Sequence, residues 1–196
     1  MTLATRVLSA SDAAAYREIR LTALQETPRV FASSYDEEAR LPLATFAEWL
    51  TVDTIFAAFS DNELCGTFSL EWSGIQRSSH IGHLKNLYVC SWARGSGVGD
   101  ALINAAVERT VGRLAQLETA VLTTNRAACR LFDRNMFSVY GIQPNGLRID
   151  GQFFDRQLRI RFLGDVAPRS VFSRCPDRST GDQRSSQTKT GEGNYP

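Results

Sequence analysis

The sequence has few of the residues that bind metal ions or form disulfides. Its 196 residues include four cysteines and two histidines, and no pair of cysteines has CxxC spacing. Zinc sites and disulfide frameworks both need such residues at close and regular spacing. We therefore expect no metal site, and we expect the cysteine thiols to be reduced.

Long apolar runs and an excess of charge are also missing. The first ten residues lack a basic segment followed by an apolar one, and no apolar run approaches the length of about 18 residues that a membrane-spanning helix needs. The formal net charge of +1 gives no electrostatic reason to expect nucleic acid or an anionic membrane as a partner. We expect a cytoplasmic protein that acts on a small molecule.

The composition is that of one globular domain with a polar tail. Hydrophobic residues make up 43% and charged residues 22% of the chain, which is long enough for one good core. After Leu163 the composition changes abruptly to Ser, Thr, Arg, Asp, Gln, Gly and Pro. We expect residues 1–163 to fold as one domain and residues 164–196 to form a disordered tail.

Apolar periodicity predicts a mixed α/β fold. The predicted order is a strand at 5–10, a helix from an N-cap at Ser11-Asp12 to about residue 24, short helices broken by turns at 27–50, a hairpin of strands at 54–59 and 64–72, a strand at 81–90, a helix at 98–111, a strand at 117–123, a helix at 125–134, and strands at 137–140 and 152–163 that flank a loop. The strand-helix-strand unit within 81–123 predicts a parallel crossover.

A glycine-rich loop, Arg94-Gly95-Ser96-Gly97-Val98-Gly99, joins the strand at 81–90 to the next helix. Glycines let successive backbone N–H groups turn toward one point, and the first N–H groups of a helix have no internal partner. The loop therefore favours an anion such as a phosphate, with Arg94 supplying a full positive charge. A glycine turn without a ligand is the alternative.

Two other phosphate-binding loops do not fit this stretch. A dinucleotide-binding fold needs GxGxxG after the first strand, and a P-loop needs Gly-Lys-Ser/Thr. This loop follows the fourth predicted strand and contains neither pattern.

The loop resembles the pyrophosphate loop of the GNAT superfamily of N-acetyltransferases, Gln/Arg-x-x-Gly-x-Gly/Ala, with Arg94, Gly97 and Gly99 at its fixed positions. The resemblance extends upstream through Leu87-Tyr88-Val89 and downstream through Asn125-x-x-Ala128-x-x-Leu131-Phe132, and it covers about five sixths of the chain. It implies the GNAT fold, which is a mixed, mostly antiparallel sheet of about six to seven strands with helices on both faces and a splayed central strand pair.

The resemblance further implies that acetyl-CoA is the acyl donor, with its pantetheine arm between the fourth and fifth strands. The residues it assigns to acetyl-CoA are Leu87, Tyr88, Val89, Arg94, Gly95, Ser96, Gly97, Val98, Gly99, Asn125 and Phe132. Asn125 suits an ordinary helix N-cap equally well, and the two roles are compatible.

Direct attack by an amine needs a base near pH 7. His83 is the first candidate, because it lies six residues before Val89, where the histone acetyltransferases of the family carry a catalytic glutamate. Glu71, on the neighbouring strand, is the second. A histidine that only packs along its strand is the alternative reading of His83.

Phe132 departs from the family pattern, because many relatives place a tyrosine there to protonate the CoA thiolate. Water, Tyr88 or Tyr140 would have to donate that proton, or the thiolate would leave unprotonated. Cys129 has no positioned base in the sequence, and we interpret it as a core residue rather than an acyl-accepting nucleophile.

In this family the acceptor site is shaped by the segment after the first helix and by the loop between the last two strands, here 27–50 and 140–151. Glu37 and Glu38 beside aromatic residues suit a cationic amine, although a solvated helix face explains them as well. The sequence therefore predicts an N-acetyltransferase for a primary amine of a small molecule, acting as a monomer or a homodimer. Acetylation of a protein N-terminus and a catalytically weak acyl-CoA-binding module stay open as alternatives.

Overall fold

The computed structural model describes residues 2–72 and 74–164, so the predicted tail from residue 165 onward lies outside the described residues. The elements in chain order are β1 (Leu3–Val7), η1 (Ala10–Asp12), α1 (Ala13–Glu26), α2 (Tyr35–Glu38), α3 (Leu43–Val52), β2 (Thr54–Ser60), β3 (Glu63–Trp72), β4 (Ile81–Val89), η2 (Ser91–Ala93), α4 (Val98–Thr110), β5 (Gln116–Leu122), α5 (Arg126–Arg134), β6 (Ser138–Ile149) and β7 (Gln152–Phe162). Within these two ranges, no helix combines the length and the apolar character needed to cross a membrane.

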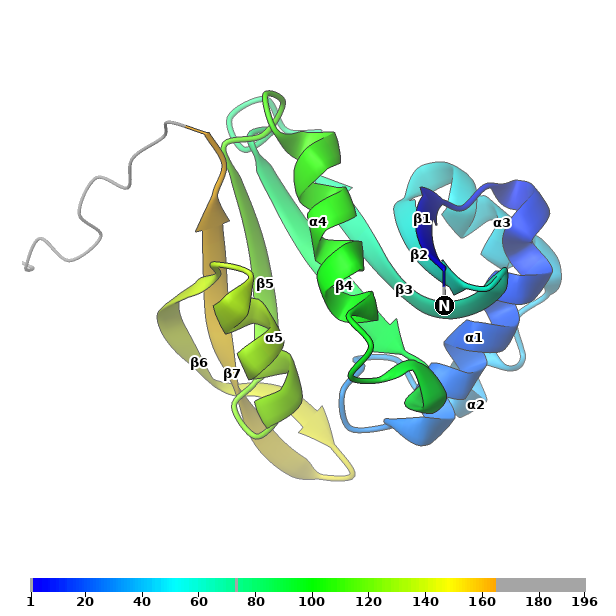
Figure 1. Cartoon of the computed structure of the whole chain (residues 1–196). Coiled ribbons are helices and arrows are strands. Elements are labelled where there is room, and N and C mark those ends of the chain that lie inside the picture. Colours follow the sequence, from blue (N-terminus) through cyan, green and yellow to red (C-terminus); the bar gives the residue numbers. More distant parts are fainter. Residues whose placement is uncertain (1, 73, 165–196) are drawn as a thin grey trace, which may run out of the picture.

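A single seven-stranded sheet in the order β1-β2-β3-β4-β5-β7-β6 runs through the molecule (Figure 1). All neighbouring strands are antiparallel except β4 and β5, which are parallel and are joined by the crossover helix α4. The predicted mixed, mostly antiparallel sheet with a parallel central pair is therefore confirmed.

Helices cover both faces of the sheet because its strands carry apolar side chains on alternate sides. On β2, Ile55 and Ala57 pack into a core with residues of α1 and α3. Their neighbours Phe56 and Ala58 pack into the opposite core with residues of α4 and α5. The two cores hold the strands of the sheet between two layers of helices.

The start of the chain differs from the prediction by a few residues. The first strand ends at Val7, and a 3-10 turn precedes α1. Asp12 does not cap α1 through its side chain, because its carboxylate accepts the Ser9 backbone N–H at 2.8 Å and pairs with Arg6 at 2.7 Å. The predicted hairpin between β2 and β3 is present, with Asp61 and Asn62 both at positive φ.

The predicted loop at 140–151 is mostly strand. β6 continues to Ile149 and returns into β7 through a tight turn in which Asp150 and Gly151 have φ of 49° and 78°. The prediction placed Pro144 in a loop, because proline interrupts the hydrogen bonding of a central strand. β6 is an edge strand, and its register shifts between Gln143 and Leu147, so the proline is tolerated.

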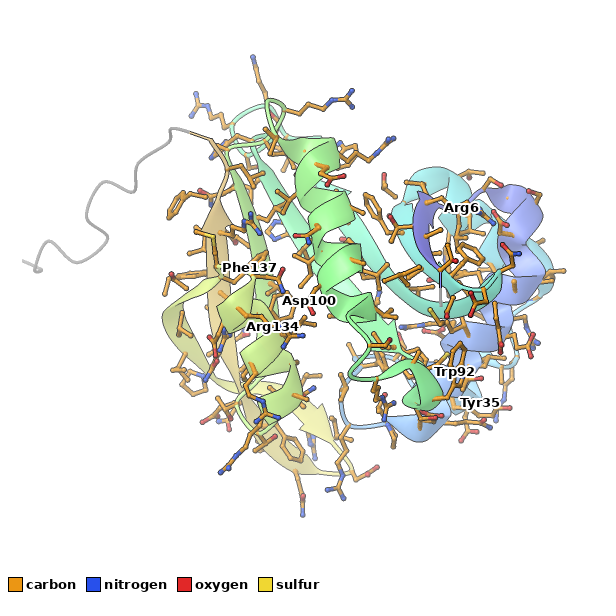
Figure 2. The ribbon with its side chains drawn as sticks, in the orientation of Figure 1. Arg6, Tyr35, Trp92, Asp100, Arg134 and Phe137 are labelled. Carbon is orange, nitrogen blue, oxygen red and sulfur yellow. The ribbon has the colours of Figure 1, made fainter. Side chains whose placement is uncertain are left out.

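Helices α4 and α5 are fixed against each other by an ion pair and by a close contact (Figure 2). Arg134 donates two hydrogen bonds of 2.7 Å to the Asp100 carboxylate, from one helix to the start of the other. A Cβ atom at Gly99 would lie 2.9 Å from Leu131 Cδ2, so the helices approach closely only because residue 99 is glycine.

Candidate functional site

The parallel strands β4 and β5 are paired only as far as the His83–Glu118 pair. Just past that point the Thr119 hydroxyl donates to the Leu84 carbonyl oxygen at 3.0 Å, and no further backbone ladder joins the two strands over the described residues. Asn86 has a positive φ of 57°, and the register of β4 against β3 shifts there, which marks a bulge. The rest of β4 thus has an edge without a strand partner, as the predicted splayed pair requires.

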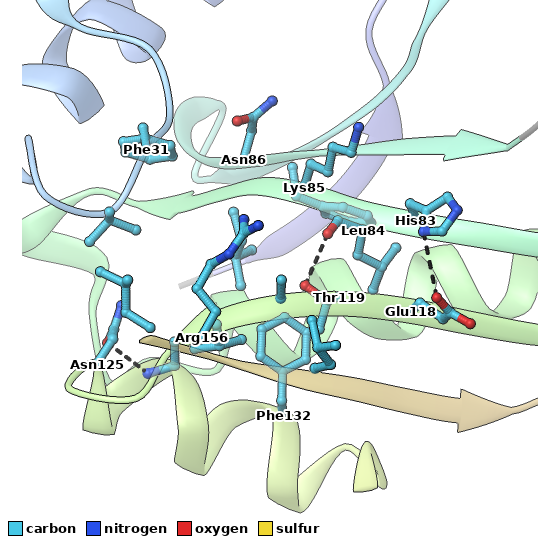
Figure 3. Close-up of a pocket in the computed structure, with 18 of the residues that line it drawn as sticks. Phe31, His83, Leu84, Lys85, Asn86, Glu118, Thr119, Asn125, Phe132 and Arg156 are labelled. Carbon is cyan, nitrogen blue, oxygen red and sulfur yellow. Dashed lines mark hydrogen bonds and ion pairs between the residues drawn. The ribbon is translucent and has the colours of Figure 1, made fainter. Parts of the chain in front are cut away.

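A cavity of about 520 Å³ lies along this gap (Figure 3). Its walls come from β4, β5, α5, the β6–β7 hairpin and the segment that follows α1. Among the sequence-predicted site residues, it brings together His83, Leu87, Asn125 and Phe132. Tyr88, Val89 and the glycine loop do not line it; the loop stands beyond the end of β4, at the start of α4.

The glycine loop presents unsatisfied backbone donors. Gly95 and Gly97 have φ of 82° and 88°, and a Cβ atom at either position would meet no atom within 4 Å. No backbone N–H from Gly95 to Gly99 donates a hydrogen bond to another residue of the described part of the chain. The Val98 side chain is buried, so residue 98 offers a ligand only its backbone. Open space above free N–H groups at a helix start fits a phosphate.

Arg94 is tied to the end of α1. Its Nε donates to the Val89 carbonyl oxygen at 3.0 Å, and its Nη2 donates to Glu26 Oε2 at 2.8 Å. The positive charge of Arg94 is therefore already partly compensated by Glu26.

Tyr88 points into the α1 side of the sheet, where its hydroxyl is buried without a hydrogen-bond partner of good geometry. Burial, together with the nearby Glu26 carboxylate, raises the pKa of Tyr88.

His83 lies beside Glu118 at the end of the cavity where β4 and β5 are still paired (Figure 3). The His83 Nδ1 atom is 3.9 Å from Glu118 Oε2, and the imidazole is 43% exposed. Glu118 is held in turn by Gln116, whose Nε2 donates to Oε1 at 2.6 Å. The separation of 3.9 Å is longer than a hydrogen bond, so Glu118 is a charged neighbour of the ring and not its hydrogen-bond partner.

Glu71, the second predicted base, faces His83 across the β3–β4 ladder but does not line the cavity. Its carboxylate forms an ion pair with Lys85. Geometry therefore favours His83 over Glu71.

Of the candidate proton donors, the structure places Tyr140 in the cavity and Tyr88 outside it. The Tyr140 hydroxyl donates to Glu118 Oε2 at 3.4 Å. Burial and the adjacent Glu118 raise the pKa of Tyr140, so this phenol keeps its proton. Phe132 also lines the cavity, and its ring packs edge-to-face on Phe137 at 5.1 Å between centroids.

Asn125 and Cys129 have local structural partners. The Asn125 Oδ1 atom accepts the Ala128 backbone N–H at 3.1 Å and caps α5, while the same residue lines the cavity. The Cys129 thiol lies 3.8 Å from the Leu122 carbonyl oxygen and 3.5 Å from Gln157 Oε1. No base is bonded to this thiol within the described residues.

Glu37 and Glu38, in the segment after α1, already have hydrogen-bond partners within the protein. Glu37 accepts the Ser34 backbone N–H at 2.9 Å and closes a capping box around α2. Glu38 is buried and receives two hydrogen bonds from Arg20, so it is neither a solvated residue nor a free anionic contact. The segment does reach the cavity, through Val30, Phe31 and Ala32.

Sequence reasoning missed three charged residues of the cavity, Lys85, Glu118 and Arg156. Glu118 sits opposite His83 only because of the register between β4 and β5, although a lone glutamate in the apolar run at 117–123 was a usable signal. Arg156 lies in the predicted strand at 152–163 and donates to Gln143 Oε1 at 2.8 Å. Only the pairing of β7 with β5 and β6 places it at the cavity. Over residues 2–72 and 74–164, no group of three or more metal-ligating side chains converges.

Comparison with known proteins identifies relatives of this arrangement. A family model described as "Acetyltransferase (GNAT) family" matches residues 19–136. No protein among the curated sequences matches the chain significantly.

Several solved structures share the fold. An acetyltransferase of the GNAT family from Streptococcus pneumoniae is 24% identical with a TM-score of 0.75, over 83% of this chain and 100% of that one. Ribosomal-protein-alanine N-acetyltransferase from Brucella melitensis is 21% identical with a TM-score of 0.71, over 82% and 99%. A Salmonella typhimurium protein solved with its cofactor acetyl-CoA is 19% identical with a TM-score of 0.69, over 85% and 97%.

Proposed function

We propose, from the premise that this chain belongs to the GNAT family of acetyltransferases, that it transfers an acetyl group from acetyl-CoA to a primary amine of a small molecule. The observation that carries the proposal is the cavity where β4 and β5 separate, with His83 at the last paired position of the two strands. The amine attacks directly while both substrates are bound, and the protein acts in the cytoplasm.

The residues present fit acetyl-CoA. The free N–H groups of Gly95 to Gly99 would hold its pyrophosphate, together with Arg94. The unpaired edge of β4 from Leu87 to Val89 would bind the pantetheine amides as a strand partner does. When bound, acetyl-CoA supplies a thioester whose sulfur is a good leaving group.

His83 accepts the proton that the amine loses, directly or through one water molecule. Glu118 stabilises the positive charge of the imidazole once the proton has arrived. A backbone N–H of the unpaired β4 edge would stabilise the negative charge that develops on the thioester oxygen. The amine nitrogen thereby gains the acetyl group as the carbon–sulfur bond breaks.

Tyr140 donates the proton that the departing thiolate takes up. Tyr140 lines the cavity, and its hydroxyl is protonated at neutral pH. This assignment compensates for Phe132 at the position where the family pattern has a tyrosine. Cys129 takes no part, because it has no base to activate it.

A small acceptor is supported by the walls of the cavity. Tyr140, Leu147 and Arg156 of the β6–β7 hairpin close one side, and Phe31 of the segment after α1 closes another.

Initial-rate measurements with both substrates varied test this reaction. Double-reciprocal plots for acetyl-CoA and an accepted amine should intersect, because both substrates must be bound before chemistry. Parallel lines, the pattern of a covalent acyl-enzyme, would contradict direct attack.

A further inference from the structure

A second cavity, of about 160 Å³, lies on the α1–α3 side of the sheet. It is lined by Arg20 and Glu38 of the helices and by Asp53 at the end of α3. Asn86, at the β4 bulge, lines this cavity as well as the one that holds His83. The two cavities therefore share a wall residue at the bulge, where the strands separate.

Arg20 brings an unsatisfied donor to the second cavity. Its side chain is 6% exposed, and its Nε and Nη2 donate to the Glu38 carboxylate at 2.9 and 2.7 Å. Its Nη1 atom is buried and has no hydrogen-bond partner in the described part of the chain. The guanidinium lies over the Phe31 ring, 4.9 Å from the centroid. A buried N–H without an acceptor raises the free energy of the folded protein, and an oxygen atom of a ligand would remove this cost.

Asp53 adds a negative charge to the second cavity. Its half-buried carboxylate has neither a hydrogen bond nor an ion pair with another described residue. Burial and the nearby Glu71 carboxylate raise the pKa of Asp53, whereas the Lys85 ammonium group lowers it. Glu38 already neutralises Arg20, and Lys85 already pairs with Glu71, so a net negative charge remains around Asp53. A cation beside Asp53 would supply what the protein does not.

We propose that the second cavity binds the non-reacting end of the acceptor, and that this end carries a second ammonium group beside a neutral oxygen atom. Asp53 pairs with the ammonium group, and Arg20 Nη1 donates to the oxygen, which belongs to a hydroxyl, ether or carbonyl group. A carboxylate end is disfavoured because the Glu38 and Asp53 carboxylates line the same cavity. The acceptor class is thus an oxygen-containing diamine, and the inference rests on the proposed acetyl transfer to an amine.

Four amine probes separate these contributions. The diamine 2,2′-(ethylenedioxy)bis(ethylamine) has both features, 1,8-diaminooctane lacks the oxygens, 2-[2-(2-aminoethoxy)ethoxy]ethanol has a hydroxyl in place of the second amine, and 8-aminooctanoic acid has an anionic end. We expect kcat/KM to be highest for the first probe, about tenfold lower for each missing feature, and lowest for the acid.

Three variants assign the effects to residues. Asp53→Asn should bring the ratio of kcat/KM between the oxygen-containing diamine and the monoamine close to one. Arg20→Lys keeps an ion pair with Glu38 but lacks Nη1, and it should remove the preference for oxygen. Glu48→Gln removes the same charge from the exposed face of α3, outside both cavities, and should leave every ratio unchanged.

Calorimetric titration of the CoA-loaded protein with the oxygen-containing diamine measures the same contact without turnover. We expect about tenfold weaker binding in Asp53→Asn than in the wild type and in Glu48→Gln. Equal binding in all three proteins, or equal kcat/KM for monoamines and diamines, would overturn this inference while leaving acetyl transfer intact. Failure of the protein to bind CoA at all would instead count against the proposed function.

Discussion

In the proposed reaction, the side chains beside the last β4–β5 pair determine how the amine loses its proton. His83 is the imidazole that lines this cavity, whereas His80 is exposed in the turn before β4 and does not reach it. Glu118 links His83 to Tyr140, since both side chains approach its Oε2 atom, at 3.9 and 3.4 Å. One carboxylate thus holds the proposed base and the proposed acid in the same cluster.

Replacing His83 by alanine should lower kcat about a hundredfold at pH 7, because general-base catalysis contributes 10²- to 10⁴-fold. The acidic limb of the kcat/KM profile, where the imidazole is protonated, should disappear with it. Affinity for acetyl-CoA should stay the same. The matched variant His80→Ala should behave as the wild type, and an unaltered pH profile in His83→Ala would point to another base or to none.

Glu26 competes with the ligand for Arg94. Its carboxylate pairs with the Arg94 guanidinium at 2.8 Å, and both side chains are partly exposed. Glu26→Gln should therefore tighten acetyl-CoA binding about two- to fivefold at low salt, because an exposed pair is worth up to about 1 kcal/mol. Glu18→Gln removes a charge from an exposed position of the same helix and should change little. Weaker binding in Glu26→Gln would mean that the ion pair positions Arg94 for the ligand.

The sequence predicted the loop conformation and the helix cap that depend on local motifs. Gly95, Gly97 and Asn125 were found because loop conformation and helix capping are encoded within a few positions. Glu118 and Arg156 were not, because they reach the cavity through strand register over long sequence separation. The burial of Glu38 was missed for the same reason, since its partner Arg20 lies on another helix.

At the scale of elements, the junction between β4 and α4 is the proposed binding site for the pyrophosphate of acetyl-CoA. Gly97 is the N-cap residue of α4 with φ of 88°, and the space beside its Cα is open. Gly112, just past the other end of the helix, has φ of 77° and equally open space. The two glycines share a conformational requirement and differ in what lies beside them.

Alanine at either glycine should destabilise the fold by about 1 kcal/mol, because a left-handed conformation costs an L-residue roughly that much. Only Gly97→Ala should also weaken acetyl-CoA binding, by about tenfold or more, since its methyl group occupies the phosphate position. Chemical denaturation and calorimetry measure the two effects separately. Equal affinity in Gly97→Ala and Gly112→Ala would remove the pyrophosphate from this loop.

Element boundaries followed from the sequence wherever the pattern was local. The β2–β3 hairpin and α4 were predicted to within two residues, because turn residues and an apolar stripe define them. β6 was cut short, since Pro144 signals a break unless one knows that the strand lies at an edge. That knowledge needs the order of the whole sheet.

On the scale of the whole molecule, two cores on opposite faces of one sheet should unfold together. A titrating group buried in either core therefore affects the stability of the whole fold. Burial raises the pKa of Tyr16, in the α1–α3 core, to about 12 from its usual value near 10. The unfolded chain then releases this proton at lower pH than the folded one, so stability is lost as pH rises between about 10 and 12.

The free energy of unfolding in urea should accordingly fall over that alkaline range, by up to about 2.7 kcal/mol for the Tyr16 contribution. Tyr16→Phe has no proton to lose and should show a weaker dependence on pH. An equally steep decline in Tyr16→Phe would assign the alkaline loss of stability to other groups, such as Tyr88, whose pKa is also raised.

The most direct test of the central claim follows the acetyl group itself. The protein is incubated with acetyl-CoA labelled in the acetyl carbonyl and a panel of primary amines, and products are measured by mass spectrometry together with CoA release. We predict a labelled N-acetyl amine formed in equal amount to the CoA, and a hundredfold slower reaction in His83→Ala. Tight binding of acetyl-CoA without any acetylated amine across the panel would contradict the account and would favour an acyl-CoA-binding module.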